Sequence, residues 1–185
     1  MKRLAWLCLF CSAVLQAQVS EQLEHTYYDV DASAYALLYS ALDQASPIRH
    51  DGKVFHGYTD WCVNWRFWWW EEPDGRCRIT RTETTLHASI TLPRLLAASP
   101  AHQQHFAAYI SALQQHENGH YQIAQAAARA IDQRLQLTAE QPSCLRLQEQ
   151  ANQQANAVLQ LHVEQEQRYD RDTEYGKTQG AWLRH

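Results

Sequence analysis

The sequence has no excess of basic residues and, after its first residues, no long apolar run. Its 16 Lys and Arg are outnumbered by 20 Asp and Glu, so the formal net charge is -4 at pH 7. Nucleic-acid binding requires a basic face, and the composition gives no indication of one. Beyond residue 17, no apolar segment is long enough to span a bilayer, so we expect no stable membrane insertion of that part.

The first 17 residues have the organisation of a secretory signal peptide. Lys2 and Arg3 form a positive region, Leu4 to Leu15 is an apolar run of about a dozen residues, and Ala17 offers a small residue for cleavage. Cleavage there leaves residues 18–185, a length that predicts one domain. We expect an exported bacterial protein, periplasmic or extracellular, and an uncleaved membrane anchor is the alternative.

Three cysteines lie after the expected leader, so at most one disulfide can form within the chain. They are Cys62, Cys77 and Cys144. A hairpin turning at residues 71–75 would place Cys62 and Cys77 out of register. Cys77–Cys144 is therefore the preferred bridge in an exported protein, and it would tie a sheet to the last helix. Three unpaired buried thiols are the alternative.

Strand patterns in the first half predict a small antiparallel sheet. Tyr58 to Trp70 and Arg76 to Leu92 are separated by the turn sequence Glu-Glu-Pro-Asp-Gly. A short strand is expected at Tyr27 to Val30, and Pro93 is expected to end the last strand. The strand that ends at Leu92 is a candidate edge for pairing with an extended substrate.

The second half has helical periodicity. A helix is expected from about Ala101 to Leu137, and a second one from about Cys144 to Tyr169, after a break that contains Pro142. A shorter helix is expected around Tyr35 to Leu42. The predicted fold class is α+β, with a small antiparallel sheet packed on one long helix and on a second long C-terminal helix.

The pattern H-E-x-x-H lies on the first long helix, at residues 116–120. His116 and His120 are four residues apart, so both imidazoles point the same way and can bind one zinc ion, while Glu117 lies where a general base is needed. Such a pattern arises by chance in roughly 3% of chains of this composition. All three residues continue the apolar stripe of the helix, where an unpaired polar group is costly and a cation would satisfy it.

Catalytic zinc usually takes three protein ligands and a water, so a third ligand is needed. The extended motif with a third histidine is absent, because Ile123 and Ala126 occupy its places. Asp170 is the preferred ligand, since an antiparallel second helix would return it to the motif. Tyr175 is expected to donate a hydrogen bond to an oxyanion, or less favourably to be a ligand. The other candidates are Asp172, Glu174, Glu164 and His162.

An aromatic cluster between Trp61 and Trp70 contains five tryptophans. One interpretation is a core packed between the sheet and the helices. The other is a surface that stacks on a ligand. The second interpretation predicts a non-catalytic cell-envelope binding module, with a structural metal or none.

Motifs spread over most of the chain resemble a bacterial family of predicted secreted zinc-dependent proteases, long described as a domain of unknown function. The residues that carry the resemblance are Tyr27-Tyr28-Asp29-Val30, Gly57-Tyr58-Thr59-Asp60-Trp61 with Trp65, Gly75-Arg76-Cys77, Ile90-Thr91-Leu92-Pro93, His116 to His120, Cys144 with Leu147, and Tyr169-Asp170 with Thr173, Tyr175-Gly176 and Gln179-Gly180-Ala181.

The resemblance implies a zincin-like fold, a bound Zn²⁺ and peptidase activity on peptide or protein substrates, cell-wall peptides included. It also fits a Cys77–Cys144 bridge. One departure is that members of the family commonly have His in place of Tyr175. If that His were a ligand, metal binding here would be altered, whereas with Asp170 as the ligand Tyr175 is tolerated. An amidase acting on peptidoglycan would use the same site.

Overall fold

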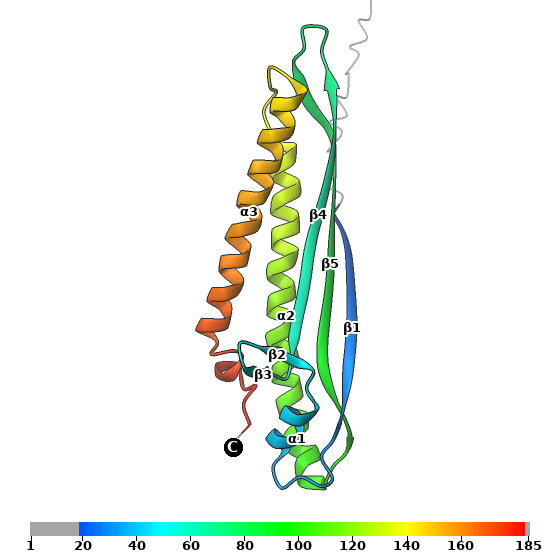
Figure 1. The fold of residues 1–185 in the computed structure, drawn as a ribbon, viewed down its shortest axis with the longest axis vertical. Coiled ribbons are helices and arrows are strands. Elements are labelled where there is room, and N and C mark those ends of the chain that lie inside the picture. The colour runs from blue at the N-terminus through cyan, green and yellow to red at the C-terminus, as the bar shows by residue number, and fades with distance from the viewer. Residues whose placement is uncertain (1–18, 184–185) are drawn as a thin grey trace, which may run out of the picture.

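In a computed structural model of the chain, residues 19–183 are described. The expected leader, residues 1–17, lies outside them. Three long strands form an extended sheet, and two long helices run along one of its faces (Figure 1). The fold is therefore mixed α+β, as the sequence predicts. No helix within residues 19–183 is long and apolar enough to cross a membrane.

The sheet has the order β1-β5-β4 and is mixed rather than antiparallel. Strands β4 (Tyr58–Glu71) and β5 (Cys77–Ala97) form the expected hairpin, but β1 (Val19–Asp31) pairs with β5 in parallel. The expectation of an antiparallel sheet is thus wrong for β1. Because β5 is the central strand, the prediction that it offers an edge to substrate is also wrong. The free edges belong to β1 and β4.

Strand β1 is much longer than the Tyr27 to Val30 segment expected from the sequence. Apolar and polar residues do not alternate in its first part, because that part contacts α2 through a polar side chain. Glu21 accepts hydrogen bonds from Tyr121, Gln125 and Arg129. Strand β5 likewise continues past Pro93. Its pairing with β4 ends at Thr91, and a residue without an N–H is tolerated where one side of a strand is unpaired.

Two long helices follow the sheet, and each bound lies within three residues of the expected one. Helix α2 spans Pro100–Gln136 and α3 spans Cys144–Asp172. A serine precedes each helix, and its side chain accepts a hydrogen bond from a backbone N–H of the first turn. Ser99 accepts from His102, and Ser143 accepts from Arg146. Since the connection between them is short, α3 returns antiparallel alongside α2 (Figure 1).

A small helix and a small hairpin connect β1 to β4. Helix α1 covers Leu38–Ala45, three residues later in the chain than expected, and β2 (Ile48–His50) pairs with β3 (Lys53–Phe55) in a short hairpin. His56 follows the hairpin and is buried, with Asp43 at 3.0 Å and the Tyr109 hydroxyl at 2.7 Å. This connection brings the chain back to the first residues of β4.

The disulfide joins Cys77 to Cys144, as preferred from the sequence. It connects the start of β5 to the start of α3. Strand register explains why the other pairing fails, because Cys62 lies opposite His87 while Cys77 lies opposite Glu71. Cys62 is exposed and free.

We predict that replacing Cys77 and Cys144 by alanine lowers the free energy of unfolding by about 4 kcal/mol, because the bridge closes a loop with a sequence separation of 67. Denaturant unfolding of the double variant and the wild type measures the difference. Cys62→Ala is the matched control and should stay within about 0.5 kcal/mol of wild type. Equal stability of all three proteins would contradict this role of the bridge.

Candidate metal centre

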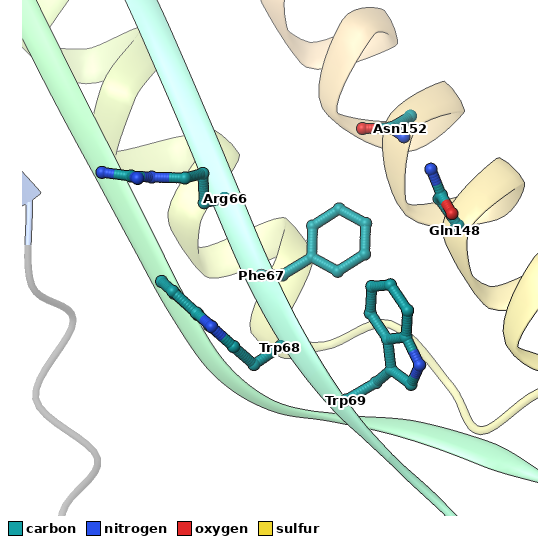
Figure 2. A pocket seen from close by; sticks show the side chains of 6 residues that line it. All are labelled: Arg66, Phe67, Trp68, Trp69, Gln148 and Asn152. Atoms are coloured by element: carbon teal, nitrogen blue, oxygen red, sulfur yellow. The ribbon is translucent and has the colours of Figure 1, made fainter.

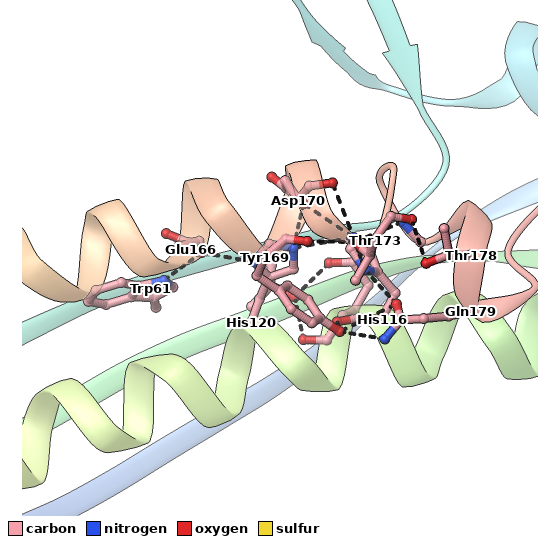
Figure 3. Close-up of polar contacts among 12 residues, drawn as sticks. Trp61, His116, His120, Glu166, Tyr169, Asp170, Thr173, Thr178 and Gln179 are labelled. Carbon is pink, nitrogen blue, oxygen red and sulfur yellow. Dashed lines mark hydrogen bonds and ion pairs between the residues drawn. The ribbon is translucent and has the colours of Figure 1, made fainter.

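Helices α2 and α3 bring three potential metal ligands together. His116 and His120 lie on successive turns of α2, and Asp170 lies near the end of α3 (Figure 3). The two Nε2 atoms are 3.3 Å apart. Oδ1 of Asp170 lies 3.3 Å from Nε2 of His116 and 3.0 Å from Nε2 of His120. These three residues are called the triad below.

The spacing of the triad is compatible with a tetrahedral metal ion such as zinc. Zn–N distances of 2.0–2.1 Å and tetrahedral angles place ligand atoms about 3.3 Å apart. The three separations in the triad agree with this value. Both histidines are buried, and two imidazoles with one carboxylate are a ligand set typical of catalytic zinc. The triad could therefore hold a zinc ion and leave a position for water.

The remaining nitrogen of each imidazole faces an oxygen. His116 Nδ1 lies 3.0 Å from Oε1 of Gln179. His120 Nδ1 lies 3.2 Å from Oε1 of Glu166, within ion-pair range but without hydrogen-bond alignment. Trp61 donates its indole N–H to the same Glu166 oxygen at 2.8 Å. Such contacts orient an imidazole so that its Nε2 points at the metal.

Tyr169 fixes the helix turn that carries the motif. Its ring stacks on that of His116, with centroids 5.1 Å apart, and its hydroxyl donates to the His116 carbonyl at 3.1 Å. The phenol passes directly over Gly119, where an added Cβ would lie 2.1 Å from the hydroxyl oxygen. A glycine in the motif is therefore required by the close approach of Tyr169.

Glu117 is buried beside the triad and is held by its neighbours. Thr59 donates a hydrogen bond to Oε2 at 2.7 Å. The second oxygen, Oε1, packs against Gly57, where an added Cβ would lie only 2.5 Å from it. Burial raises the pKa of the Glu117 carboxyl, against the lowering effect of Thr59 and the imidazoles. A raised pKa makes the carboxylate a stronger base than that of an ordinary glutamate, as a general base requires.

Opposite charges stabilise the contact between α2 and α3. Burial alone would lower the pKa of His120, but contacts with Asp170 and Glu166 outweigh it and raise the pKa to about 9. Burial alone would raise the pKa of Asp170, yet hydrogen bonds with His116 and His120 hold it at about 2. At neutral pH the contact therefore contains a carboxylate and, without a metal, a protonated His120.

The other candidate ligands do not join the triad. Tyr175 is half exposed and its ring lies 5.8 Å from that of Phe55, with the Lys53 ammonium 5.7 Å from the ring centre. His162 Nδ1 lies 2.9 Å from the carbonyl of Val158 in its own helix. Among the described residues, the only other ligand-type group is Glu71, Cys77 and Cys144, whose two sulfurs are bonded to each other.

A groove with a volume of about 1430 Å³ passes over the triad. The first residues of β4 line it, as do Leu159, Val163 and Glu166 of α3. The β2–β3 hairpin and the residues after α3, including Tyr175, close one end. Glu117 also lines the groove, so a molecule bound there would contact this carboxyl.

A family model described as a bacterial protein of unknown function (DUF922) matches residues 25–177. The chain belongs to this family. The matched region contains all of the triad, Glu117 and Tyr175. No curated protein and no solved structure matches the chain.

In this DUF922 chain, the sequence assigned no role at the triad to several residues around it, although most of them carry the family resemblance. They are Thr59, Glu166, Tyr169 and Gln179 as contacts of the motif, and Gly57 and Gly119 as close approaches. Spacing offered a signal for Glu166, because it lies four residues before Asp170 and so on the same face of α3. Thr59 and Gln179 come from distant segments, and their contacts depend on the tertiary fold.

The pKa values predict how the chelated protein responds to pH. His120 has a raised pKa, so its contact with Asp170 stabilises fully below about 6.5 and is lost as pH rises towards about 9. Asp170 has a lowered pKa, so the same contact is lost as pH falls from about 4 towards about 2. Thermal unfolding of EDTA-treated protein should therefore show a decline in stability between pH 6.5 and 9.

The His120→Ala variant provides the control for this decline, because it lacks the titrating group. It should be less stable than wild type near pH 6 and should show a smaller fall above that pH. Zinc should reverse the trend in the wild type, because metal binding needs neutral imidazoles and strengthens as pH rises. A wild-type profile that matches His120→Ala throughout contradicts the assigned contact.

Proposed function

We propose that this chain is an exported zinc-dependent hydrolase that cleaves peptide bonds, with His116, His120 and Asp170 as its metal ligands. The observation that carries the proposal is the convergence of three ligand atoms at zinc spacing beside a buried carboxyl. The signal-like leader and the Cys77–Cys144 bridge support export.

A zinc ion held here would supply Lewis-acid chemistry, activating a water and polarising a carbonyl. Glu117 then acts as the general base. Its Oε2 is occupied by Thr59, which leaves Oε1 to accept a proton from the attacking water. The hydroxyl adds to the peptide carbon, and the C–N bond breaks as Glu117 passes the proton to the leaving amine. Tyr175, at one end of the groove, remains our candidate for hydrogen bonding to the oxyanion.

Strand β4 is the edge on which an extended substrate would lie. It is the outer strand on the groove side, and Thr59 beside its start holds Glu117. A peptide that paired with this edge would have its backbone next to the triad. Strand β5, which the sequence suggested for this role, is paired on both sides near the site.

A second candidate function is a non-catalytic cell-envelope binding module. The observation in its favour is that Trp68, Trp69 and Trp70 are 40%, 43% and 57% exposed, near the hairpin tip. Figure 2 shows Phe67 and Trp69 directed towards Gln148 and Asn152 of α3, across a pocket of about 440 Å³. Trp61 and Trp65 instead donate hydrogen bonds to α3, through Glu166 and Asn152, which fits the core interpretation.

The direct test compares casein cleavage and zinc content in wild type and Glu117→Gln. We predict that wild type binds one zinc per chain and cleaves casein, and that the variant keeps its zinc but loses at least about 100-fold in rate, because the general base is removed. Glu164→Gln, an exposed acid on α3, is the matched control and should behave as wild type.

Two results would contradict the hydrolase proposal. One is well-folded protein that takes up no zinc. The other is a zinc-loaded wild type no more active than Glu117→Gln. Zinc without turnover, together with quenching of tryptophan fluorescence by cell-wall glycan, would favour the binding module.

A further inference from the structure

The outer edge of β4 is free where it passes the triad. Strand β4 is hydrogen-bonded to β5 along one edge only. Within residues 19–183, no further backbone hydrogen bond involves residues 58–63. These residues form a wall of the groove, so their unpaired backbone groups face the space that a peptide would occupy.

Tyr58 and Asp60 lie on the opposite face of β4 from Thr59. Side chains alternate along a strand, and Thr59 points inward to Glu117 while Tyr58 and Asp60 are exposed. A residue of a paired chain directly opposite Asp60 would have its Cβ about 5 Å from that of Asp60. A lysine or arginine at that position could therefore reach the Asp60 carboxylate.

Within the part of the chain that the structure describes, Asp60 has no ion-pair partner, unlike the other acids of the groove apart from Glu117, Glu166 and Asp170 at the triad. Asp43 pairs with His56, Asp51 with His50, and Glu174 with Lys177. Among the described residues, Asp60 makes no ion pair within 4.0 Å, although it lines the same groove. The groove's lysines lie elsewhere, Lys53 over Tyr175 and Lys177 over Trp182. Asp60 thus has charge available for a ligand.

The aromatic ring beside Asp60 adds a second attraction for a cation. Tyr58 is 52% exposed. Partial burial raises the pKa of its phenol, and the nearby charges of Asp60, Glu166 and Glu117 raise it further. Acidic groups thus lie near the ring, and an aromatic face also attracts a cation.

We propose that Tyr58 and Asp60 form a subsite for one basic side chain, so that the substrates are extended peptides carrying lysine or arginine next to the cleaved bond. This inference rests on the proposed hydrolase function and names its substrate class. Backbone pairing with β4 holds the peptide, the Asp60 carboxylate pairs with its cation, and the Tyr58 ring covers the aliphatic part of the side chain.

The test uses two pools of short fluorescent peptides that carry either Lys or Glu at one central position, with small and apolar residues elsewhere. Binding to zinc-loaded, full-length Glu117→Gln is measured by anisotropy. The Lys pool should bind about tenfold more tightly than the Glu pool. Adding Asp60→Asn should reduce the preference to about twofold, and Asp60→Lys should invert it.

Glu71→Gln, an exposed acid at the far end of β4, is the matched control and should keep the tenfold preference. Equal binding of the two pools, no binding of either, or an undiminished preference in Asp60→Asn overturns the subsite. Cleavage assays with protein that keeps Glu117 distinguish the subsite proposal from the hydrolase proposal. Equal cleavage of both pools keeps the hydrolase and removes the subsite, whereas Asp60-dependent binding with no cleavage of either pool removes the hydrolase.

Discussion

The antiparallel packing of α3 on α2 is the contact on which the candidate site depends. Both helices bury alanines in one apolar cluster: Ala124, Ala127 and Ala128 from α2, and Ala151 and Ala155 from α3. Small side chains allow two helices to approach closely. A shift of α3 by one residue would move Asp170 by about 1.5 Å and turn it by about 100°. The position of Asp170 beside the two histidines is therefore set by apolar packing several turns away.

The ends of this helix pair are held by different interactions. At one end, the Cys77–Cys144 bridge ties the start of α3 to β5. At the other, Tyr169 stacks on His116, and Gln179 reaches back to the same imidazole. Polar groups at that end are buried, and burial is costly unless partners are present. The opposite charges of His120 and Asp170 offset that cost in the protein alone, and a cation in the triad would do so as well.

The sequence predicted the parts of the site that lie on regular helices. His116, Glu117 and His120 continue an apolar stripe, and their burial follows from it. Asp170 could be preferred because two long helices joined by a short loop must run antiparallel. The parallel pairing of β1 could not be predicted, since Glu21 contacts α2 through polar side chains and leaves no alternation. The contacts of Thr59 and Gln179 with α2 could not be predicted either, because they join segments distant in sequence.

Whether the triad binds zinc can be decided by locating the ion. A crystal of the zinc-loaded protein, with diffraction measured on both sides of the zinc absorption edge, shows where the metal lies. We expect one anomalous peak about 2 Å from Nε2 of His116, Nε2 of His120 and a carboxylate oxygen of Asp170. A peak bound by other residues, or a triad without zinc in crystals grown with the metal in excess, would contradict it.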